Sequence, residues 1–176
     1  QQDIEQLLNA CKRGNRSAQV QVYKQYHQAM FNTALRIVND RQEAEDVMQE
    51  SFLSAFTKLD SYYQQSTFGA WLKRIVINRS ISHLRKKQYF IPLSDQQHDI
   101  SDDNDFSTKA PSYQVKEVKR AIMALNESYR IPLSLKLIEG YDYDEISEIM
   151  GITNQNCRTI VSRAKSKVRR MMAEMN

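Results

Sequence analysis

An acidic, polar stretch near the middle of the chain is the feature that most constrains the fold. Residues 94–111 contain few apolar side chains and show no helical or strand periodicity. A segment of this composition buries too little apolar surface to offset the entropy lost on ordering, so we expect a flexible linker there. The chain of 176 residues is therefore predicted to form two small domains, residues 1–87 and 115–176, joined by residues 88–114.

Both flanking segments predict helices. Gly and Pro are scarce, at 4 and 3 residues, which disfavours turn-rich β folds and glycine-lined phosphate sites. Apolar residues recur at helical spacing, and side chains able to cap a helix N-terminus precede most of these runs. The expected N-caps are Asp3, Ser17, Asp40, Thr67, Asn126, Asp142 and Thr153. The predicted fold class is all-α, with two small helical domains on either side of the linker.

The segment 142–165 predicts a helix-turn-helix. Gly151 can adopt the left-handed backbone that joins two helices at a steep angle, and Ile152 follows as an apolar plug for the turn. The second helix shows a three-four alternation of apolar residues, as expected of a helix with one buried face. These residues are Cys157, Ile160, Val161, Ala164 and Val168.

The other face of that second helix carries short and basic donors. Its first turns present Arg158, Thr159, Ser162 and Arg163, and Lys165 follows. Arginine pairs with guanine edges in the major groove, and serine or threonine adapts to several bases. Further along lie three more basic residues that could reach phosphates, namely Lys167, Arg169 and Arg170. An ordinary helical hairpin with a basic face is the alternative, but the turn residues and the local basic charge favour DNA recognition.

The helix predicted for residues 40–59 has an unusual polar face. Its expected core stripe is Ala44, Met48, Phe52, Ala55 and Leu59. The opposite side carries Asp46, Gln49, Glu50 and Thr57, with Leu53 among them. A leucine within an acidic, polar face suggests a protein-docking surface. A solvated face with one stray apolar residue is the alternative.

A basic helix, residues 68–87, follows a loop that contains two tyrosines, Tyr62 and Tyr63. Its polar and basic positions are Lys73, Arg74, Asn78, Arg79, Arg85, Lys86 and Lys87. Unstacked bases bind aromatic faces beside basic grooves, so this pairing suits single-stranded nucleic acid. Surface tyrosines without a role are an equally good interpretation from the residues alone, and Trp71 is expected in the core.

The chain resembles bacterial RNA polymerase sigma factors. Residues 43–56 and 68–85 resemble region two of that family, and residues 143–152 with the following helix resemble region four. The specific motifs are Asp46-x-x-Gln49-Glu50 and Trp71-Leu-x-Arg-Ile-x-x-Asn78. With only these two regions and a short linker, the chain is similar to the extracytoplasmic function (ECF) group.

The resemblance implies roles for all three predicted surfaces. It implies that the acidic face of Asp46, Gln49, Glu50 and Leu53 docks on the clamp coiled coil of RNA polymerase. It implies that the loop of residues 60–67, with Tyr62 and Tyr63, captures a base flipped from the minus-ten element. The helix after that loop would lie on the same DNA through Asn78, Arg79, Arg85 and Lys86. The recognition helix would read the minus-thirty-five element through Arg158, Thr159, Ser162, Arg163 and Lys165.

The predicted function is that of an alternative sigma factor, which directs core RNA polymerase to specific promoters and assists their melting. The expected partners are core polymerase and promoter DNA, both duplex and melted, with a membrane-anchored anti-sigma factor as a candidate regulator. We expect no enzymatic activity, no cofactor, no metal and no small-molecule substrate, because the chain has no metal-spaced His and Cys or clustered carboxylates. A cytoplasmic location is expected, because the two widely spaced cysteines, Cys11 and Cys157, form no disulfide framework and so fit a reducing compartment. No apolar run approaches the roughly 18 residues of a membrane span.

Two other classes of function are the alternatives to this one. A stand-alone helix-turn-helix regulator would bind its operator without polymerase, usually as a dimer on two half-sites. An enzyme acting on nucleic acid would need a metal site, paired carboxylates or a phosphate loop, and the sequence offers none of them.

Overall fold

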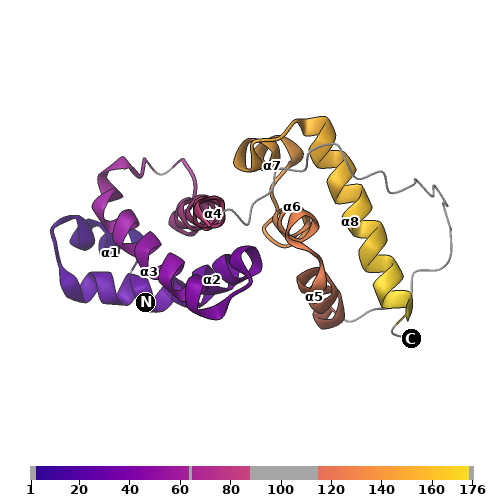
Figure 1. Cartoon of the computed structure of the whole chain (residues 1–176). Helices are drawn as coiled ribbons and strands as arrows, with labels where there is room; N and C mark the ends of the chain where they lie inside the picture. Colours follow the sequence, from indigo (N-terminus) through magenta and orange to yellow (C-terminus); the bar gives the residue numbers. More distant parts are fainter. Residues whose placement is uncertain (1–2, 64, 88–114, 175–176) are drawn as a thin grey trace. The chain divides into compact units, whose positions relative to one another are not determined.

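The computed structural model describes residues 3–63, 65–87 and 115–174 of the chain. These residues form eight α-helices and one short 3₁₀ helix, with no strand among them (Figure 1). The chain divides into two compact units, Gln1–Lys87 and Gln88–Asn176. The all-α fold class predicted from the sequence is confirmed. The predicted linker, residues 88–114, lies outside the described residues.

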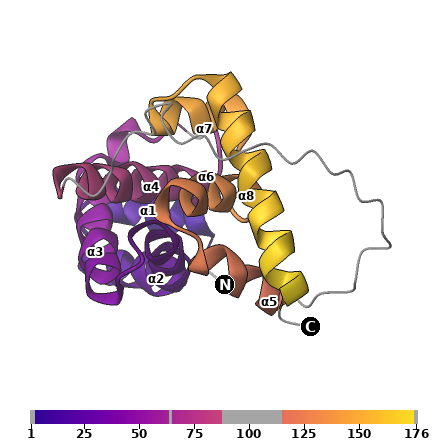
Figure 2. The ribbon, with the colours of Figure 1, turned by 45° about the vertical axis from the view of Figure 1, so that its right-hand side comes forward.

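The first unit is a small bundle of four α-helices. They are α1 (Ile4–Lys12), α2 (Arg16–Val38), α3 (Arg41–Thr57) and α4 (Phe68–Lys86), with the 3₁₀ helix η1 (Leu59–Ser61) after α3. Helices α2, α3 and α4 pack against one another in all three pairings, and α1 packs on α2 (Figure 2). The bundle therefore holds α3 and α4, the two helices with predicted binding residues, as direct neighbours.

The core of the first unit follows the predicted apolar stripe. Ala44, Met48, Phe52, Ala55 and Leu59 are all buried. From α4, Leu72, Val76, Ile77 and Ile81 are buried as well. Burial of these side chains supplies the main stabilisation of a bundle this small, and it leaves the outer faces of α3 and α4 available for other contacts.

Capping side chains set the helix starts in this unit, with one difference from prediction. Asp40 Oδ1 accepts from the Glu43 amide at 2.9 Å and Thr67 Oγ1 accepts from the Ala70 amide at 3.3 Å, as expected. The prediction of Ser17 as the cap of α2 is wrong. Asn15 caps that helix, with its side-chain oxygen 3.1 Å from the Ala18 amide. Gly14 takes a φ of +78°, so the chain is already redirected before Asn15 and the helix can begin two residues earlier.

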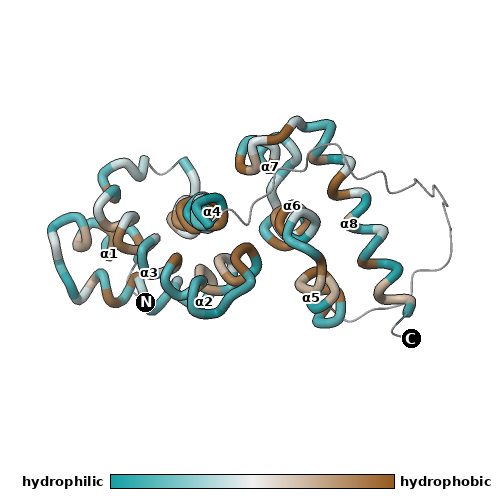
Figure 3. Tube along the Cα trace, in the orientation of Figure 1, coloured by the Kyte–Doolittle hydropathy of each residue, from teal (hydrophilic) through white to brown (hydrophobic). Residues whose placement is uncertain are grey.

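The second unit contains the remaining helices, arranged around the longest of them. They are α5 (Val115–Ala124), α6 (Glu127–Leu137), α7 (Tyr143–Met150) and α8 (Asn154–Glu174). Helix α8 contacts the other three, with α7 near its N-terminal end and α5 toward its C-terminal end (Figures 1 and 2). Its predicted core residues Cys157, Ile160, Val161, Ala164 and Val168 are all buried. Hydrophobic and hydrophilic positions accordingly alternate along α8 (Figure 3).

The turn between α7 and α8 has the conformation that a helix-turn-helix requires. Gly151 adopts φ 67° and ψ 35°, in the left-handed region where a side chain would be strained. Asp142 and Glu145 form a complete capping box at the start of α7, and Thr153 Oγ1 accepts from the Asn156 amide at 3.2 Å at the start of α8. Local hydrogen bonds therefore fix both helix starts and the angle between the helices.

Candidate binding surfaces

The predicted recognition residues lie together on the first half of α8. Arg158, Ser162 and Arg163 are exposed, whereas Thr159 and Lys165 are half-buried. The Thr159 hydroxyl donates to the Gln155 carbonyl at 3.0 Å. The face that these residues share points away from the buried stripe of the same helix, because residues three and four apart occupy one side of an α-helix.

Arg158 is held by neighbouring side chains. Its guanidinium carbon lies 4.5 Å from the centroid of the Tyr143 ring, and its Nε donates to Asn154 Oδ1 at 2.7 Å. Beyond the recognition face, Arg169 and Arg170 are exposed, and Lys167 Nζ lies 5.1 Å from the Tyr129 ring centroid. The helix is thus basic along its length and has one arginine near its N-terminus with a defined position.

The predicted docking face of α3 is open to solvent. Asp46, Gln49, Glu50 and Leu53 are all exposed, and Leu53 is 69% exposed. Their spacing of three, one and three residues places them on one side of the helix, opposite the core stripe. A large apolar side chain surrounded by polar groups that can be desolvated is typical of the centre of a protein interface.

An ion pair links this face to the predicted DNA-binding helix. Arg79 of α4 donates to the Glu50 carboxylate at 2.8 Å, with side-chain exposures of 36% and 61%. Exposed pairs of this kind contribute about 0–1 kcal/mol. If Arg79 leaves Glu50 to bind a phosphate oxygen, the lost ion pair therefore lowers its affinity for DNA by at most about a factor of five. The pairing leaves both residues available to partners. The sequence places Glu50 and Arg79 on different predicted surfaces and gives no sign of their contact, because the two residues are 29 positions apart.

The two loop tyrosines differ in their surroundings. Tyr62 is half-buried, donates its hydroxyl to the Ser66 carbonyl at 2.7 Å, and has its ring centroid 5.4 Å from that of Trp71. Tyr63 is 78% exposed. The prediction that Trp71 belongs to the core is only partly right, since Trp71 is half-buried at the edge of the bundle in contact with Tyr62 and Phe68. Tyr62 thus holds the loop, and Tyr63 presents a free ring face.

The remaining predicted contacts of α4 lie on its outer side. Asn78, Arg85 and Lys86 are exposed and Arg79 is half-buried. Arg85 and Lys86 occupy the last turn of α4, where basic side chains also interact favourably with the helix dipole. They and the exposed Tyr63 thus belong to the same helical bundle.

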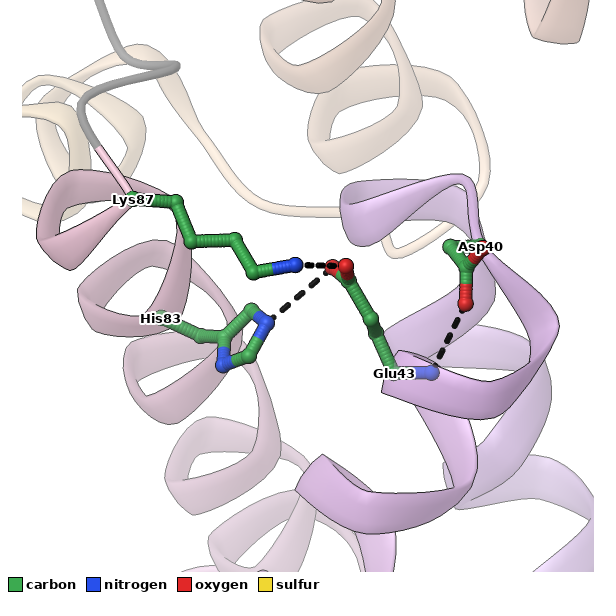
Figure 4. Close-up of polar contacts among 4 residues, drawn as sticks. All are labelled: Asp40, Glu43, His83 and Lys87. Carbon is green, nitrogen blue, oxygen red and sulfur yellow. Dashed lines mark hydrogen bonds and ion pairs between the residues drawn. The ribbon is translucent and has the colours of Figure 1, made fainter.

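A three-residue polar cluster joins the start of α3 to the end of α4 (Figure 4). The Glu43 carboxylate contacts His83 Nε2 at 3.0 Å and also binds the Lys87 ammonium group. Glu43 stands three residues after the N-cap Asp40, but its side chain turns toward α4, so only the backbone half of a capping box is present. His83 and Lys87 are 40 and 44 positions from Glu43, so no local pattern indicates the cluster.

Neither cysteine lies in a reactive environment. Cys11 and Cys157 are free and buried, and burial raises the pKa of both thiols. Within residues 3–63, 65–87 and 115–174, His, Cys, Asp and Glu side chains form no group of three that could hold a metal ion. In the same ranges, none of the helices combines the length and hydropathy needed to cross a membrane.

Comparison with known proteins identifies both units. Residues 22–89 match the family Sigma-70 region 2, and residues 116–168 match Sigma-70, region 4. The chain is 28% identical over 150 residues to the ECF RNA polymerase sigma factor SigM of Bacillus subtilis, covering 85% of this chain and 91% of that protein. It is 28% identical over 179 residues to the RNA polymerase sigma-H factor of Pseudomonas aeruginosa, covering 96% and 93% respectively.

Solved structures show the same fold. The sigma factor RpoE of Bartonella quintana, crystallised with the anti-sigma factor NepR, superposes with a TM-score of 0.58 at 24% identity, over 87% of this chain and 95% of that one. CnrH, in complex with the cytosolic domain of CnrY, gives a TM-score of 0.56 at 19% identity, over 97% of each chain.

The two matched regions and their relatives define this chain as a member of the sigma-70 family of RNA polymerase sigma factors. Within that family it belongs to the ECF group. It is an alternative sigma factor that directs RNA polymerase to promoters and binds both the core enzyme and promoter DNA. The alternative of a stand-alone helix-turn-helix regulator is therefore rejected.

Proposed function

We propose that the two units divide promoter recognition between them. Residues 1–87 dock on core polymerase and hold the minus-ten element, and residues 115–176 read the minus-thirty-five element. Residues 88–114 connect them toward the RNA exit path of the polymerase. One covalent chain raises the effective concentration of each DNA contact for the other, provided that the connection spans both sites.

The docking contact is assigned to Asp46, Gln49, Glu50 and Leu53. Leu53 supplies the apolar centre, since it is 69% exposed among the polar side chains of this face. The carboxylates of Asp46 and Glu50 supply complementary charge for a basic partner surface, which speeds encounter and fixes register. The proposed polymerase-binding face and the hydrophobic core of the bundle thus lie on opposite sides of α3.

Promoter melting is assigned to the loop before α4 and to the outer side of that helix. Tyr63 offers an exposed ring to an unstacked base, and such stacking contributes about 1–3 kcal/mol. Tyr62 supports the loop through Ser66 and Trp71. Asn78, Arg79, Arg85 and Lys86 bind the same DNA through its backbone and edges. Together these contacts offset the few kcal/mol needed to extrude a base.

Upstream recognition is assigned to Arg158, Thr159, Ser162, Arg163 and Lys165. The observation that carries this assignment is the exposed, donor-rich face on the first turns of α8, directly after the Gly151 turn. Recognition helices of helix-turn-helix proteins contact base edges with their N-terminal residues. Arg169 and Arg170 lie past the groove and act on phosphates.

The protein performs no chemistry in this proposal. Promoter selection arises from binding to polymerase and to promoter DNA, without cofactor, metal or small-molecule substrate. The proposed location is the cytoplasm. A membrane-anchored anti-sigma factor is the proposed regulator and would cover the same exposed docking and DNA-binding surfaces in the resting cell.

A paired substitution tests the placement of α8. Arg158→Ala should weaken promoter binding by holoenzyme and relax preference at one base pair of the upstream element, because a bidentate arginine–guanine contact contributes about 1–3 kcal/mol of discrimination. Arg170→Ala should weaken all sequences equally and reduce the salt slope by roughly one unit. Binding is measured across a salt series and a set of single-base variants. The placement is wrong if the two variants behave the other way round.

A further inference from the structure

A chain of contacts leads from the first helix of the helix-turn-helix to the guanidinium of Arg158. Asn154 Nδ2 donates to Asp144 Oδ1 at 2.5 Å, and Asn154 Oδ1 accepts from Arg158 Nε at 2.7 Å. The ring of Tyr143 lies 4.5 Å from the guanidinium carbon. Tyr143 of α7 and Asn154 of α8 therefore contact the same arginine, and Asp144 of α7 contacts Asn154.

Donor and acceptor chemistry fixes the orientation of the Asn154 amide. A carboxylate such as Asp144 only accepts hydrogen bonds, and a guanidinium such as that of Arg158 only donates them. The amide must therefore direct its nitrogen toward Asp144 and its oxygen toward Arg158. The reverse orientation would place donor against donor and acceptor against acceptor.

The Tyr143 ring has a fixed position of its own. Tyr143 is the first residue of α7, directly after the N-cap Asp142 and within the capping box that Asp142 forms with Glu145. Its ring also lies 4.5 Å from Lys136 Nζ of α6, and that ammonium group donates to the Tyr141 carbonyl at 3.2 Å. The ring is thus anchored by the helix start behind it and by a cation from a third helix.

These contacts engage one nitrogen and one face of the guanidinium. Nε donates to Asn154 and the guanidinium carbon lies over the Tyr143 ring, which leaves the two terminal nitrogens as a fork of donors for another partner. A fork of two parallel donors matches the O6 and N7 acceptors of guanine. An arginine held in this way loses less side-chain entropy on binding than one that is free to rotate.

We propose that Tyr143 and Asn154 are positioning residues that set the base specificity of Arg158 without touching DNA themselves. This inference rests on the proposed function, in which Arg158 reads a base of the upstream element. Asp144 acts one step further back by holding the Asn154 amide. The specificity of the recognition helix then depends on α7 as well as on α8 itself.

The test measures base preference, which a purely structural role would not change at one position only. Full-length protein is assembled with core RNA polymerase and used to select from duplex DNA randomised across the minus-thirty-five element. The variants are Arg158→Ala, Tyr143→Leu, Tyr143→Phe, Asn154→Ala and the double variant Arg158→Ala/Tyr143→Leu. Tyr129→Leu is the matched control, because it also removes a ring beside a cation of α8, Lys167, but far from Arg158 in sequence.

Arg158→Ala should reduce preference at one base pair by about 5- to 150-fold. Tyr143→Leu and Asn154→Ala should each reduce preference at that same base pair. For Tyr143→Leu, which removes the ring contact, the reduction should be about two- to five-fold. Tyr143→Phe and Tyr129→Leu should match the wild type. The double variant should match Arg158→Ala alone, because a positioning residue has no effect once the residue it positions is gone.

Two results would overturn the inference in distinguishable ways. If Arg158→Ala relaxes one base pair but Tyr143→Leu and Asn154→Ala lower affinity uniformly or not at all, the positioning role is wrong and the proposed function stands. If Arg158→Ala leaves all preferences unchanged, both are wrong. Asn154→Ala keeps the test valid should Tyr143→Leu fail to fold.

Discussion

Leu53 and Tyr63 are the two most exposed large hydrophobic side chains among the described residues of the first unit. Both are large and apolar or aromatic, and they are 69% and 78% exposed. Burying a leucine side chain contributes about 1.5–3 kcal/mol of free energy, and the free protein lacks this contribution at Leu53. A partner that buries either side chain gains that free energy, provided that it also satisfies the polar groups it covers.

The docking face gives the first prediction. Replacing Gln49 and Leu53 with Arg should abolish binding to core polymerase, because it removes the apolar centre and adds positive charge to an acidic face. Helicity should stay unchanged, since both side chains are exposed. Co-purification with core polymerase measures the effect, with circular dichroism as the control for folding. Unchanged co-purification would contradict the docking assignment.

The loop tyrosines give a second prediction, in which two adjacent residues behave differently. Tyr63→Ala should impair open-complex formation while changing the free energy of unfolding by less than about 0.5 kcal/mol. Tyr62→Ala should impair it too, but with a loss of stability, because its hydroxyl and ring hold Ser66 and Trp71. Permanganate footprinting of the transcription bubble and urea unfolding separate the two effects. Pre-melted templates should partly rescue both variants. Wild-type footprints in both would refute the loop assignment.

The buried cysteines give a prediction about pH. The thiolate is the reactive form, and burial raises the pKa of Cys11 and Cys157, so less thiolate is present at any pH below that value. Alkylation by iodoacetamide should therefore be slow in the native protein at pH 8 and fast in urea at the same pH. Fast native alkylation at either residue would show that its environment differs from the one described.

At the scale of helices, the elements were readable from sequence because their signals are local. Asp40, Thr67 and Asp142 are within a few residues of the amides they cap, and the stripe from Ala44 to Leu59 has helical spacing. Asn15 and Ser17 are both good caps, and only the backbone at Gly14 decides between them.

Contacts between helices could not be read in the same way. The Arg79–Glu50 pair and the Glu43 cluster join positions 29 to 44 residues apart. The Tyr143–Arg158 contact depends on the angle that the Gly151 turn imposes on two helices. The sequence therefore predicts residues for the candidate surfaces but gives no sign of the contacts that hold those residues in place.

The Glu43 cluster gives a prediction at this scale. Glu43→Gln should lower the free energy of unfolding of the first unit by about 1–2 kcal/mol, because it weakens the contacts of a half-buried carboxylate with the half-buried His83 and with the exposed Lys87 at the end of α4. Glu45→Gln, an exposed carboxylate on the same helix, is the matched control and should change stability by less than about 0.5 kcal/mol. Equal effects of the two substitutions in urea unfolding would mean that the cluster does not stabilise the helix pair.

At the scale of the whole chain, charge is distributed by segment. The net charge is +4, yet residues 88–114 hold five acidic residues against one basic, and residues 151–176 hold six basic against one acidic. Phosphate contacts release counterions and make binding salt-dependent, so the basic C-terminal helix suits the DNA contact proposed for it. Each unit alone presents a small surface, and joining two weak contacts through one chain gives useful affinity.

The measurement that tests the central claim most directly is run-off transcription on fragmented genomic DNA with purified core polymerase. Wild-type protein should produce transcripts from a discrete set of start sites that share an upstream sequence motif. The Gln49→Arg/Leu53→Arg variant should produce none of them. Arg158→Ala should reduce transcripts most at the sites that carry the base contacted by Arg158. If core polymerase with wild-type protein starts at the same sites as core polymerase alone, this account of promoter selection is contradicted.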